Sequence, residues 1–275
     1  MEPWVKAWLQ EDIGRGDVTT LGLGSAAIKQ GEAYWVAKAG GVIAGLPIAA
    51  YAFEVLDKSV AFHPLVSDGT CVEPGQRIAI LRGPLGSLLT GERVALNLAM
   101  RLSGIATATR QYVDAIAHFP TQLVDTRKTT PGLRLLEKYA TTIGGAKNHR
   151  MGLDDSVMIK DNHIAAVGGI GAAIQQIRAQ MPYPLSIEVE TEHLDQVKEA
   201  LDHGADIIML DNMEPELMRQ AVQIIRQVGE RIQIEASGNI TLDTIGINAA
   251  TGVDYISSSA PITRSPWLDL SMRIC

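Results

Sequence analysis

Short apolar runs that end in polar or charged residues recur through the second half of the chain. Successive runs lie about 20–30 residues apart, which is the length of one βα unit. The runs and the residues that end them are Leu123–Val124 with Asp125 to Lys128, Val157–Ile159 with Lys160, Ile187–Val189 with Glu190, Ile207–Leu210 with Asp211, Ile232–Ile234 with Glu235 to Ser237, and Tyr255–Ile256 with Ser257 to Ser259. Because the carboxyl ends of parallel strands share one face of an α/β sheet or barrel, we expect these polar residues to form one site.

The first part of the chain follows a different pattern, in which alternating segments are separated by turns such as Asp68-Gly69 and Pro74-Gly75. This pattern predicts an α+β arrangement. The expected elements are helices over 3–12, 47–56 and 90–104 and strands over 32–38, 42–44, 60–64 and 77–82. In the second part, helical spacing over 191–203, 215–228 and 242–250 alternates with the apolar runs. The chain is therefore predicted to be an α/β protein with a parallel sheet or barrel after the α+β part.

The formal net charge of -7 makes the chain acidic, so the cations at the predicted strand ends form a local cluster rather than a basic surface. A local cluster favours a small anionic ligand and argues against nucleic acid, which needs a broad basic stripe. No apolar run is long enough for a membrane span. The acidic N-terminus does not have the pattern of a signal peptide. Two isolated cysteines, Cys71 and Cys275, fit a reducing compartment, and we expect a cytoplasmic protein.

Acids and small polar residues complete the set at the strand ends. Glu190 and Asp211 are oxygen donors of the kind that hold Mg²⁺ together with substrate phosphate. The segments Ser237–Asn239 and Ser257–Ser259 are short polar loops of the type that bind phosphate through backbone N–H groups. The residues by themselves predict a site for a phosphorylated and carboxylated substrate, without specifying the reaction.

Motifs along nearly the whole chain closely resemble the quinolinate phosphoribosyltransferase family, also called carboxylating nicotinate-nucleotide pyrophosphorylases. Each motif is weak alone, whereas all of them in order are specific. The motifs are Glu11 to Thr20, Glu92-Arg93, Leu102 to Thr107, Asp125 to Gly132, Lys147 to Leu153, Ile159 to His163, Ile187 to Glu190, Leu210 to Asn212, and Glu235 to Asn239.

This resemblance implies a fold, a reaction and partners. The fold is an open α/β barrel (106–258) with an N-terminal α+β sandwich domain (1–105) that the C-terminal tail (259–275) completes. The reaction joins quinolinate to phosphoribosyl pyrophosphate, with Mg²⁺, and gives nicotinate mononucleotide, pyrophosphate and CO₂ for NAD synthesis. Members of the family are homodimers, which in some cases assemble as hexamers of three dimers.

The resemblance also implies roles for individual residues. The cations Arg127, Lys128, His149, Arg150 and Lys160 match the pocket for the quinolinate carboxylates and nearby phosphate, together with Thr126. Lys128, Glu190 and Asp211 match catalytic positions, and the two acids match the ribose and Mg²⁺ ligands. Arg93 matches a residue that each subunit donates to its partner. The 5′-phosphate loops match Ser237, Gly238, Asn239, Ser258, Ser259 and Ala260.

Two departures and two alternatives stay open. Ser259 and Thr263 stand where many relatives have glycine and histidine, and the run Ser259-Ala260-Pro261 resembles a sister family of pyrophosphorylases that act on another base. Thr142 stands where relatives often have arginine, and it is assigned no role. A catalytically idle, ligand-sensing barrel is the other alternative. We expect Lys138 and Arg134 to be ordinary surface charges. Glu188 is expected to face Lys160 or Lys128.

Overall fold

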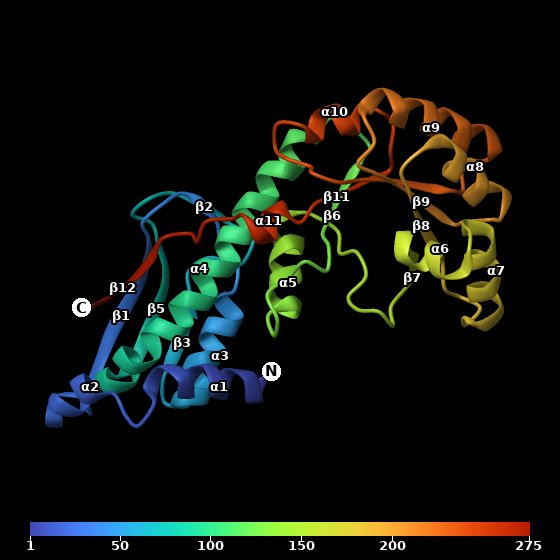
Figure 1. Cartoon of the computed structure of the whole chain (residues 1–275). Helices are drawn as coiled ribbons and strands as arrows, with labels where there is room; N and C mark the ends of the chain where they lie inside the picture. The colour runs from blue at the N-terminus through green and yellow to red at the C-terminus, as the bar shows by residue number, and fades with distance from the viewer. The chain divides into compact units, whose positions relative to one another are not determined.

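The computed structural model describes the whole chain, Met1–Cys275, and the chain divides into two compact units. The first unit comprises Met1–Ala108, Thr142–Gly144 and Ser265–Cys275. The second comprises Thr109–Thr141 and Gly145–Arg264 (Figure 1). The domain boundaries expected from the sequence stay a prediction, because compactness alone does not define a segment that folds by itself.

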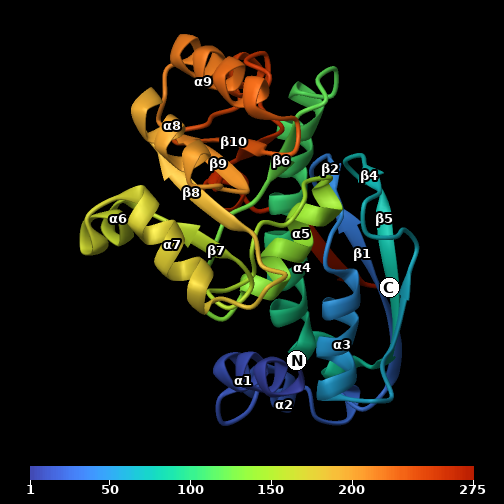
Figure 2. The same cartoon turned by 90° about the vertical axis from the view of Figure 1, so that its right-hand side faces the viewer.

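The first unit is built on an antiparallel four-stranded sheet with the order β12-β1-β5-β3. Two helices, α3 and α4, run along one face of this sheet (Figure 2). Trp35 of β1, Phe53 of α3 and Phe62 of β3 pack their rings together between helix and sheet. The elements of this unit are α1 (Glu2–Ile13), α2 (Val18–Gly22), η1 (Gly24–Ala26), β1 (Gln30–Ala37), β2 (Gly41–Val42), α3 (Leu46–Leu56), β3 (Ala61–Pro64), β4 (Cys71–Val72), β5 (Arg77–Pro84), β12 (Leu270–Ile274) and the first part of α4 (Leu85–Ala115).

The C-terminal tail completes this sheet. Strand β12 pairs antiparallel with β1, with Met272 opposite Trp35 and Leu270 opposite Ala37. The backbone N–H of Lys38 donates to the carbonyl of Asp269 and extends the pairing. The prediction of an N-terminal domain that is closed by the end of the chain is therefore confirmed.

The second unit contains a parallel six-stranded sheet with the order β6-β11-β10-β9-β8-β7. Its two outer strands, β6 and β7, do not pair, so the barrel is open as expected. Helices α7, α8 and α9 pack against one another in order, outside the sheet (Figure 1). The strands are β6 (Gln122–Val124), β7 (Val157–Ile159), β8 (Ile187–Thr191), β9 (Ile207–Asp211), β10 (Gln233–Ser237) and β11 (Tyr255–Ser257). The helices are α5 (Arg134–Gly144), α6 (Asp161–Val167), α7 (Ile170–Gln180), α8 (Leu194–Asp202), α9 (Pro215–Val228), α10 (Ile245–Ala249) and α11 (Ala260–Thr263).

Helix α4 is longer than the sequence predicts. The expected helix over 90–104 ends at Gly104, because glycine commonly ends a helix. In the structure the helix continues to Ala115. A Cβ atom at position 104 would lie 2.1 Å from the carbonyl oxygen of Pro266, so Gly104 serves a close approach of two backbones. None of the helices, α4 included, combines the length and the apolar character needed to cross a membrane.

Candidate active site

The carboxyl ends of the six parallel strands surround a pocket of about 620 Å³ within the second unit. All but one of the substrate-binding residues predicted from the strand ends and the family motifs line it. These are Thr126, Arg127, Lys128, His149, Arg150, Lys160, Glu190, Asp211, Ser237, Gly238, Asn239, Ser258, Ser259 and Ala260. Arg93 is the predicted residue that does not line it; this exposed side chain lies on α4, in the first unit.

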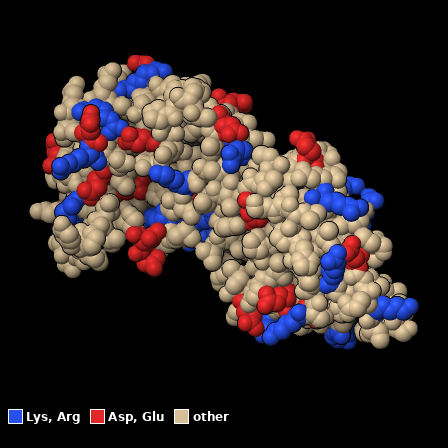
Figure 3. All heavy atoms as spheres, turned by 180° about the vertical axis from the view of Figure 1, so that it is seen from behind, with Lys and Arg blue, Asp and Glu red and all other residues tan.

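Positive charge collects at one end of the pocket, where Arg127 and Arg150 lie close enough to repel each other. Burial, and after it the charge of Arg127, lowers the pKa of Arg150. The Nε atom of Arg127 is buried and has no hydrogen-bond partner in the protein. A buried N–H group without an acceptor is costly. This end of the pocket therefore suits an anion that can accept hydrogen bonds from guanidinium groups. On the face shown in Figure 3, by contrast, acidic and basic side chains are interspersed.

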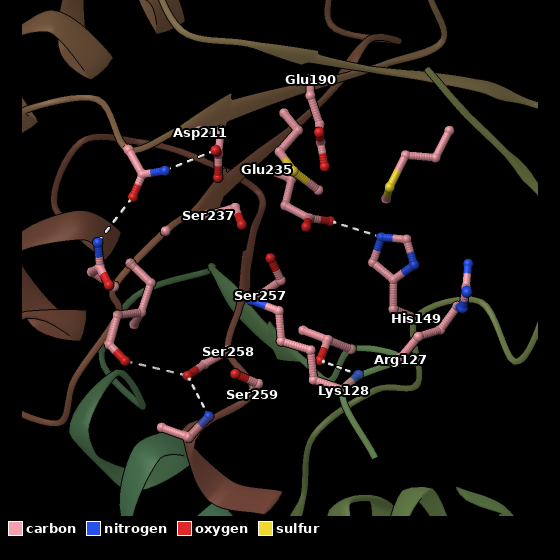
Figure 4. Close-up of a pocket in the computed structure, with 18 of the residues that line it drawn as sticks. Arg127, Lys128, His149, Glu190, Asp211, Glu235, Ser237, Ser257, Ser258 and Ser259 are labelled. Atoms are coloured by element: carbon pink, nitrogen blue, oxygen red, sulfur yellow. Dashed lines mark hydrogen bonds and ion pairs between the residues drawn. The ribbon is translucent and has the colours of Figure 1, made fainter. Parts of the chain in front are cut away.

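His149 lies beside Arg127 in the wall of the pocket (Figure 4). Its Nε2 atom is 3.2 Å from Oε2 of Glu188 and 3.4 Å from Oε2 of Glu235. Its Nδ1 atom accepts a hydrogen bond of 2.7 Å from the backbone N–H of Arg150. Glu188 thus faces His149, and the expectation that it pairs with Lys160 or Lys128 is wrong.

Two features of this cluster favour different protonation states of His149. Burial lowers the pKa of His149, but hydrogen bonds and charge attraction from Glu188 and Glu235 outweigh burial and raise the pKa to about 10. Burial also raises the pKa of Glu188. A doubly protonated ring would place an N–H at Nδ1, directly opposite the N–H of Arg150. Two donors at this distance repel each other, so we assign the neutral ring with its proton on Nε2.

The acids Glu190 and Asp211 lie along one side of the pocket (Figure 4). Glu190 forms an ion pair with Lys160, and Asp211 accepts a 2.8 Å hydrogen bond from the side-chain amide of Asn212. Both acids are half-buried at the ends of β8 and β9, which pair with each other. Two carboxylates on neighbouring strands form a donor set that fits Mg²⁺, which binds oxygen ligands.

The opposite end of the pocket is formed by two loops of small residues, after β10 and β11 (Figure 4). Gly238 has a φ of 99°, and a Cβ atom there would lie 2.2 Å from Oδ1 of Asn212. The hydroxyl of Ser258 accepts the backbone N–H of Ala260 and donates to the carbonyl of Ile240. These contacts fix the backbone of both loops, whose small residues line this end of the pocket.

Comparison with known proteins decides the family. Residues 17–103 match the quinolinate phosphoribosyl transferase N-terminal domain, and residues 105–273 match the C-terminal domain of the same family. The chain belongs to this family.

Similar proteins match over nearly their whole length. A Synechocystis protein named probable nicotinate-nucleotide pyrophosphorylase (carboxylating) is 61% identical, over 100% of this chain and 92% of the relative. A Bacillus subtilis protein of the same name is 45% identical over 96% of this chain and 90% of the relative. The crystal structure of NadC from Streptococcus pyogenes has a TM-score of 0.94 at 42% identity and covers 99% of this chain and 95% of its own. The resemblance and the fold class stated from the motifs are confirmed.

Several pocket residues were not assigned a place by the sequence. Arg264 lines the pocket directly after α11, one residue beyond the Thr263 that was matched to a histidine position. Asn212 has a positive φ of 51° and links Asp211 to Asn239 by side-chain hydrogen bonds. The position of Asn212 directly after β9 was a signal for that residue, whereas Arg264 follows a helix. The other lining residues for which the sequence predicted no place are Met158, Met209 and Ile240.

Lys138 is fully buried, and the expectation of a surface charge there is wrong. Its ammonium group forms an ion pair with Asp125, which is also buried and also accepts the hydroxyl of Thr141. Asp125 in turn accepts the backbone N–H of His149 at 2.8 Å. The pair therefore supports the segment that carries the pocket cations. Arg134 is not a free surface charge either, because it donates to the carbonyl of Met151.

We expect Lys138→Ala to lower the free energy of unfolding by about 3–5 kcal/mol, because it leaves the buried Asp125 carboxylate without its cation. Urea denaturation monitored by circular dichroism measures this change. Lys198→Ala serves as the control, since Lys198 is exposed and forms only a helical surface pair with Asp195. Equal stability losses in the two variants would contradict a structural role for Lys138.

Proposed function

We propose that the chain transfers the phosphoribosyl group of phosphoribosyl pyrophosphate to the ring nitrogen of quinolinate and decarboxylates the product. The bond from ribose C1 to pyrophosphate breaks, and a bond from C1 to the ring nitrogen forms. The C2 carboxylate then leaves as CO₂, and a proton takes its place, which gives nicotinate mononucleotide. Such a step would form the pyridine nucleotide in NAD synthesis. The names of the relatives support this activity.

The observation that carries this proposal is the paired cationic end of the pocket. Arg127 and Arg150 both line the pocket, the charge of Arg127 helps to lower the pKa of Arg150, and Nε of Arg127 is buried without an acceptor. Quinolinate carries two adjacent carboxylates, which match two guanidinium groups in charge and in planar hydrogen-bonding geometry. The hydroxyl of Thr126 accepts the backbone N–H of Lys128 and shapes the adjacent turn. Lys128 and Lys160 also line the pocket, where Lys160 pairs with Glu190.

The two acids, Glu190 and Asp211, and the loops after β10 and β11 suit phosphoribosyl pyrophosphate. Loss of pyrophosphate leaves positive charge on ribose C1, which Glu190 and Asp211, as pocket-lining carboxylates, would stabilise. Ser237, Gly238 and Asn239, with Ser258, Ser259 and Ala260, would bind the 5′-phosphate. Lys128 is proposed as a catalytic cation that faces the leaving pyrophosphate. Once ribosylated, the cationic ring accepts the electrons of decarboxylation, so no covalent nucleophile is required.

We further propose that Glu190 and Asp211 bind Mg²⁺ together with substrate oxygens. Both are half-buried carboxylates that line the pocket, although Lys160 forms an ion pair with Glu190. When bound, the cation would neutralise developing charge on pyrophosphate. A homodimer in which Arg93 serves the partner's site, assembled in some cases into hexamers, is the proposed partnership. The free thiols of Cys71 and Cys275 are compatible with the proposed cytoplasmic location.

One assay tests the proposed function directly. Purified protein is mixed with quinolinate, phosphoribosyl pyrophosphate and Mg²⁺, and nicotinate mononucleotide, pyrophosphate and CO₂ are each quantified. Equal molar amounts of the three products are expected. Absence of nicotinate mononucleotide with quinolinate would contradict the proposal, and turnover of another pyridine base would favour the sister activity. Binding without any turnover would indicate a sensor.

We expect Arg127→Ala and Arg150→Ala each to lower kcat/KM for quinolinate by about 10- to 150-fold, because a hydrogen bond to a charged group is worth about 1.5–3 kcal/mol. Arg127→Lys is expected to recover little, since an ammonium group cannot bind a carboxylate bidentately. Arg219→Ala, at an exposed pair with Glu216, is the matched control. Unchanged kinetics in both pocket variants would remove the carboxylate-binding assignment.

A further inference from the structure

Both ring nitrogens of His149 are occupied by the protein. Nδ1 accepts the backbone N–H of Arg150, and Nε2 faces the Oε2 atoms of Glu188 and Glu235. The backbone N–H of His149 is held separately by Asp125. The ring thus lines the pocket without a nitrogen left to contact a ligand. A direct bond from His149 to a substrate carboxylate, as the family resemblance implies, does not fit this geometry.

The contact at Nδ1 determines the tautomer. A nitrogen that accepts an N–H bond carries no proton, so the ring proton lies on Nε2, between the two carboxylates. This arrangement also argues against a metal ion at Nε2. A metal-bound histidine usually donates through its other nitrogen, whereas Nδ1 accepts here.

Glu188 and Glu235 are placed to hold this proton. They come from β8 and β10, on either side of β9, and are 1% and 4% exposed. The Oε1 atom of each is buried and has no partner, so neither carboxylate is held by another donor at that atom. Two buried acids face each other across one N–H group, and that group ties both to His149.

We propose that Glu188 and Glu235 are positioning residues that orient His149, and that His149 positions Arg150 for the substrate carboxylate. The proposal rests on the proposed function, because it concerns the assembly of that same carboxylate-binding site. The main chain of Arg150 is held by Nδ1 of His149, while its guanidinium donates to the carbonyl of Ser156 and contacts the sulfur of Met158. His149 therefore acts through Arg150 and not through a bond of its own to quinolinate.

Two substitutions of His149 separate the two ring contacts. In His149→Asn the amide oxygen lies near the position of Nδ1 and can accept the Arg150 N–H. In His149→Gln the amide lies near the position of Nε2 and can reach the glutamates, but the acceptor for Arg150 is lost. We expect the KM for quinolinate to rise about tenfold in His149→Gln and about threefold or less in His149→Asn, the range that one hydrogen bond covers. In both variants kcat and the KM for phosphoribosyl pyrophosphate should change little.

Glu188→Gln and Glu235→Gln test the contacts of the two glutamates with Nε2 of His149. Each should raise the KM for quinolinate several-fold, and neither should add to the effect of His149→Gln, because residues in one network are not additive. Glu216→Gln, at an exposed acid of α9, is the matched control. A larger rise of the KM for quinolinate in His149→Asn than in His149→Gln would overturn the proposal. So would full additivity of the glutamate substitutions with His149→Gln.

The tautomer provides a readout that does not depend on activity or on stability of the variants. In protein with ¹⁵N-labelled histidine, the signal of His149 is identified by its absence from His149→Asn. We expect an unprotonated Nδ1 and a protonated Nε2, both before and after quinolinate is added. A doubly protonated ring that responds to quinolinate, or Zn²⁺ or Mn²⁺ bound stoichiometrically through Nε2, would overturn the proposal. Failure of the proposed function is a separate result, namely a wild-type protein that forms no nicotinate mononucleotide.

Discussion

Nicotinate is expected to be used on the order of 10³-fold less efficiently than quinolinate, because a site built for two carboxylates leaves a half-buried guanidinium group unpaired when one is absent. Arg127 is the residue that we expect to lose most when one carboxylate is absent. Nε of Arg127 is buried and has no acceptor in the protein, and Arg150 beside it adds a second positive charge. A substrate with one carboxylate neutralises only one of these guanidinium groups.

The comparison is clean because both substrates give the same product. Ribosylation of nicotinate forms nicotinate mononucleotide directly, so one chromatographic measurement follows both reactions, and CO₂ is released from quinolinate alone. Nicotinate should also inhibit the quinolinate reaction only weakly. Weak inhibition would show that nicotinate is a poor substrate because it binds weakly at this end of the pocket. Comparable kcat/KM values for the two substrates would place the protein outside the activity proposed for it.

Arg93→Ala and Lys160→Ala are expected to lose most activity alone and to regain part of it when mixed. Lys160 lines the pocket in the second unit, where it pairs with Glu190, whereas Arg93 is exposed on α4 in the first unit. If Arg93 serves the partner's pocket, a mixed dimer contains one site with both residues intact and one site that lacks both. Random exchange in a C₂ dimer would restore about a quarter of the wild-type sites.

This complementation separates a shared site from a site made by one chain. Within a single chain, each variant lacks one essential residue, so mixing would restore nothing. Subunit exchange is verified first with two differently tagged copies of the wild-type protein, and Arg219→Ala mixed with Lys160→Ala serves as the control for nonspecific effects. A mixture that stays inactive after verified exchange would make Arg93 intramolecular or purely structural.

The spacing of apolar runs along the chain was enough to predict most of the second unit and its pocket. The apolar runs mark the six strands of the second unit, and the residues that end them line one pocket. This succeeds because a parallel sheet places every strand end on one face, so position along the chain determines position in space. Glu190 and Asp211 follow successive apolar runs, and the strands that carry them, β8 and β9, pair directly.

Contacts between residues far apart in the sequence determined the features that spacing did not predict. Gly104 is a common signal for a helix end, yet it lies inside α4, where the close approach of Pro266 leaves no room for a side chain. Lys138 is a surface residue by its chemistry, yet Asp125 at the end of another element allows it to be buried. His149 is a candidate ligand by its motif, yet Glu188, Glu235 and the Arg150 backbone occupy its nitrogens. Periodicity determined by itself which residues reach the strand ends. Only the tertiary structure determined which of them remain free to bind, because pairing depends on partners that the fold brings together from distant parts of the chain.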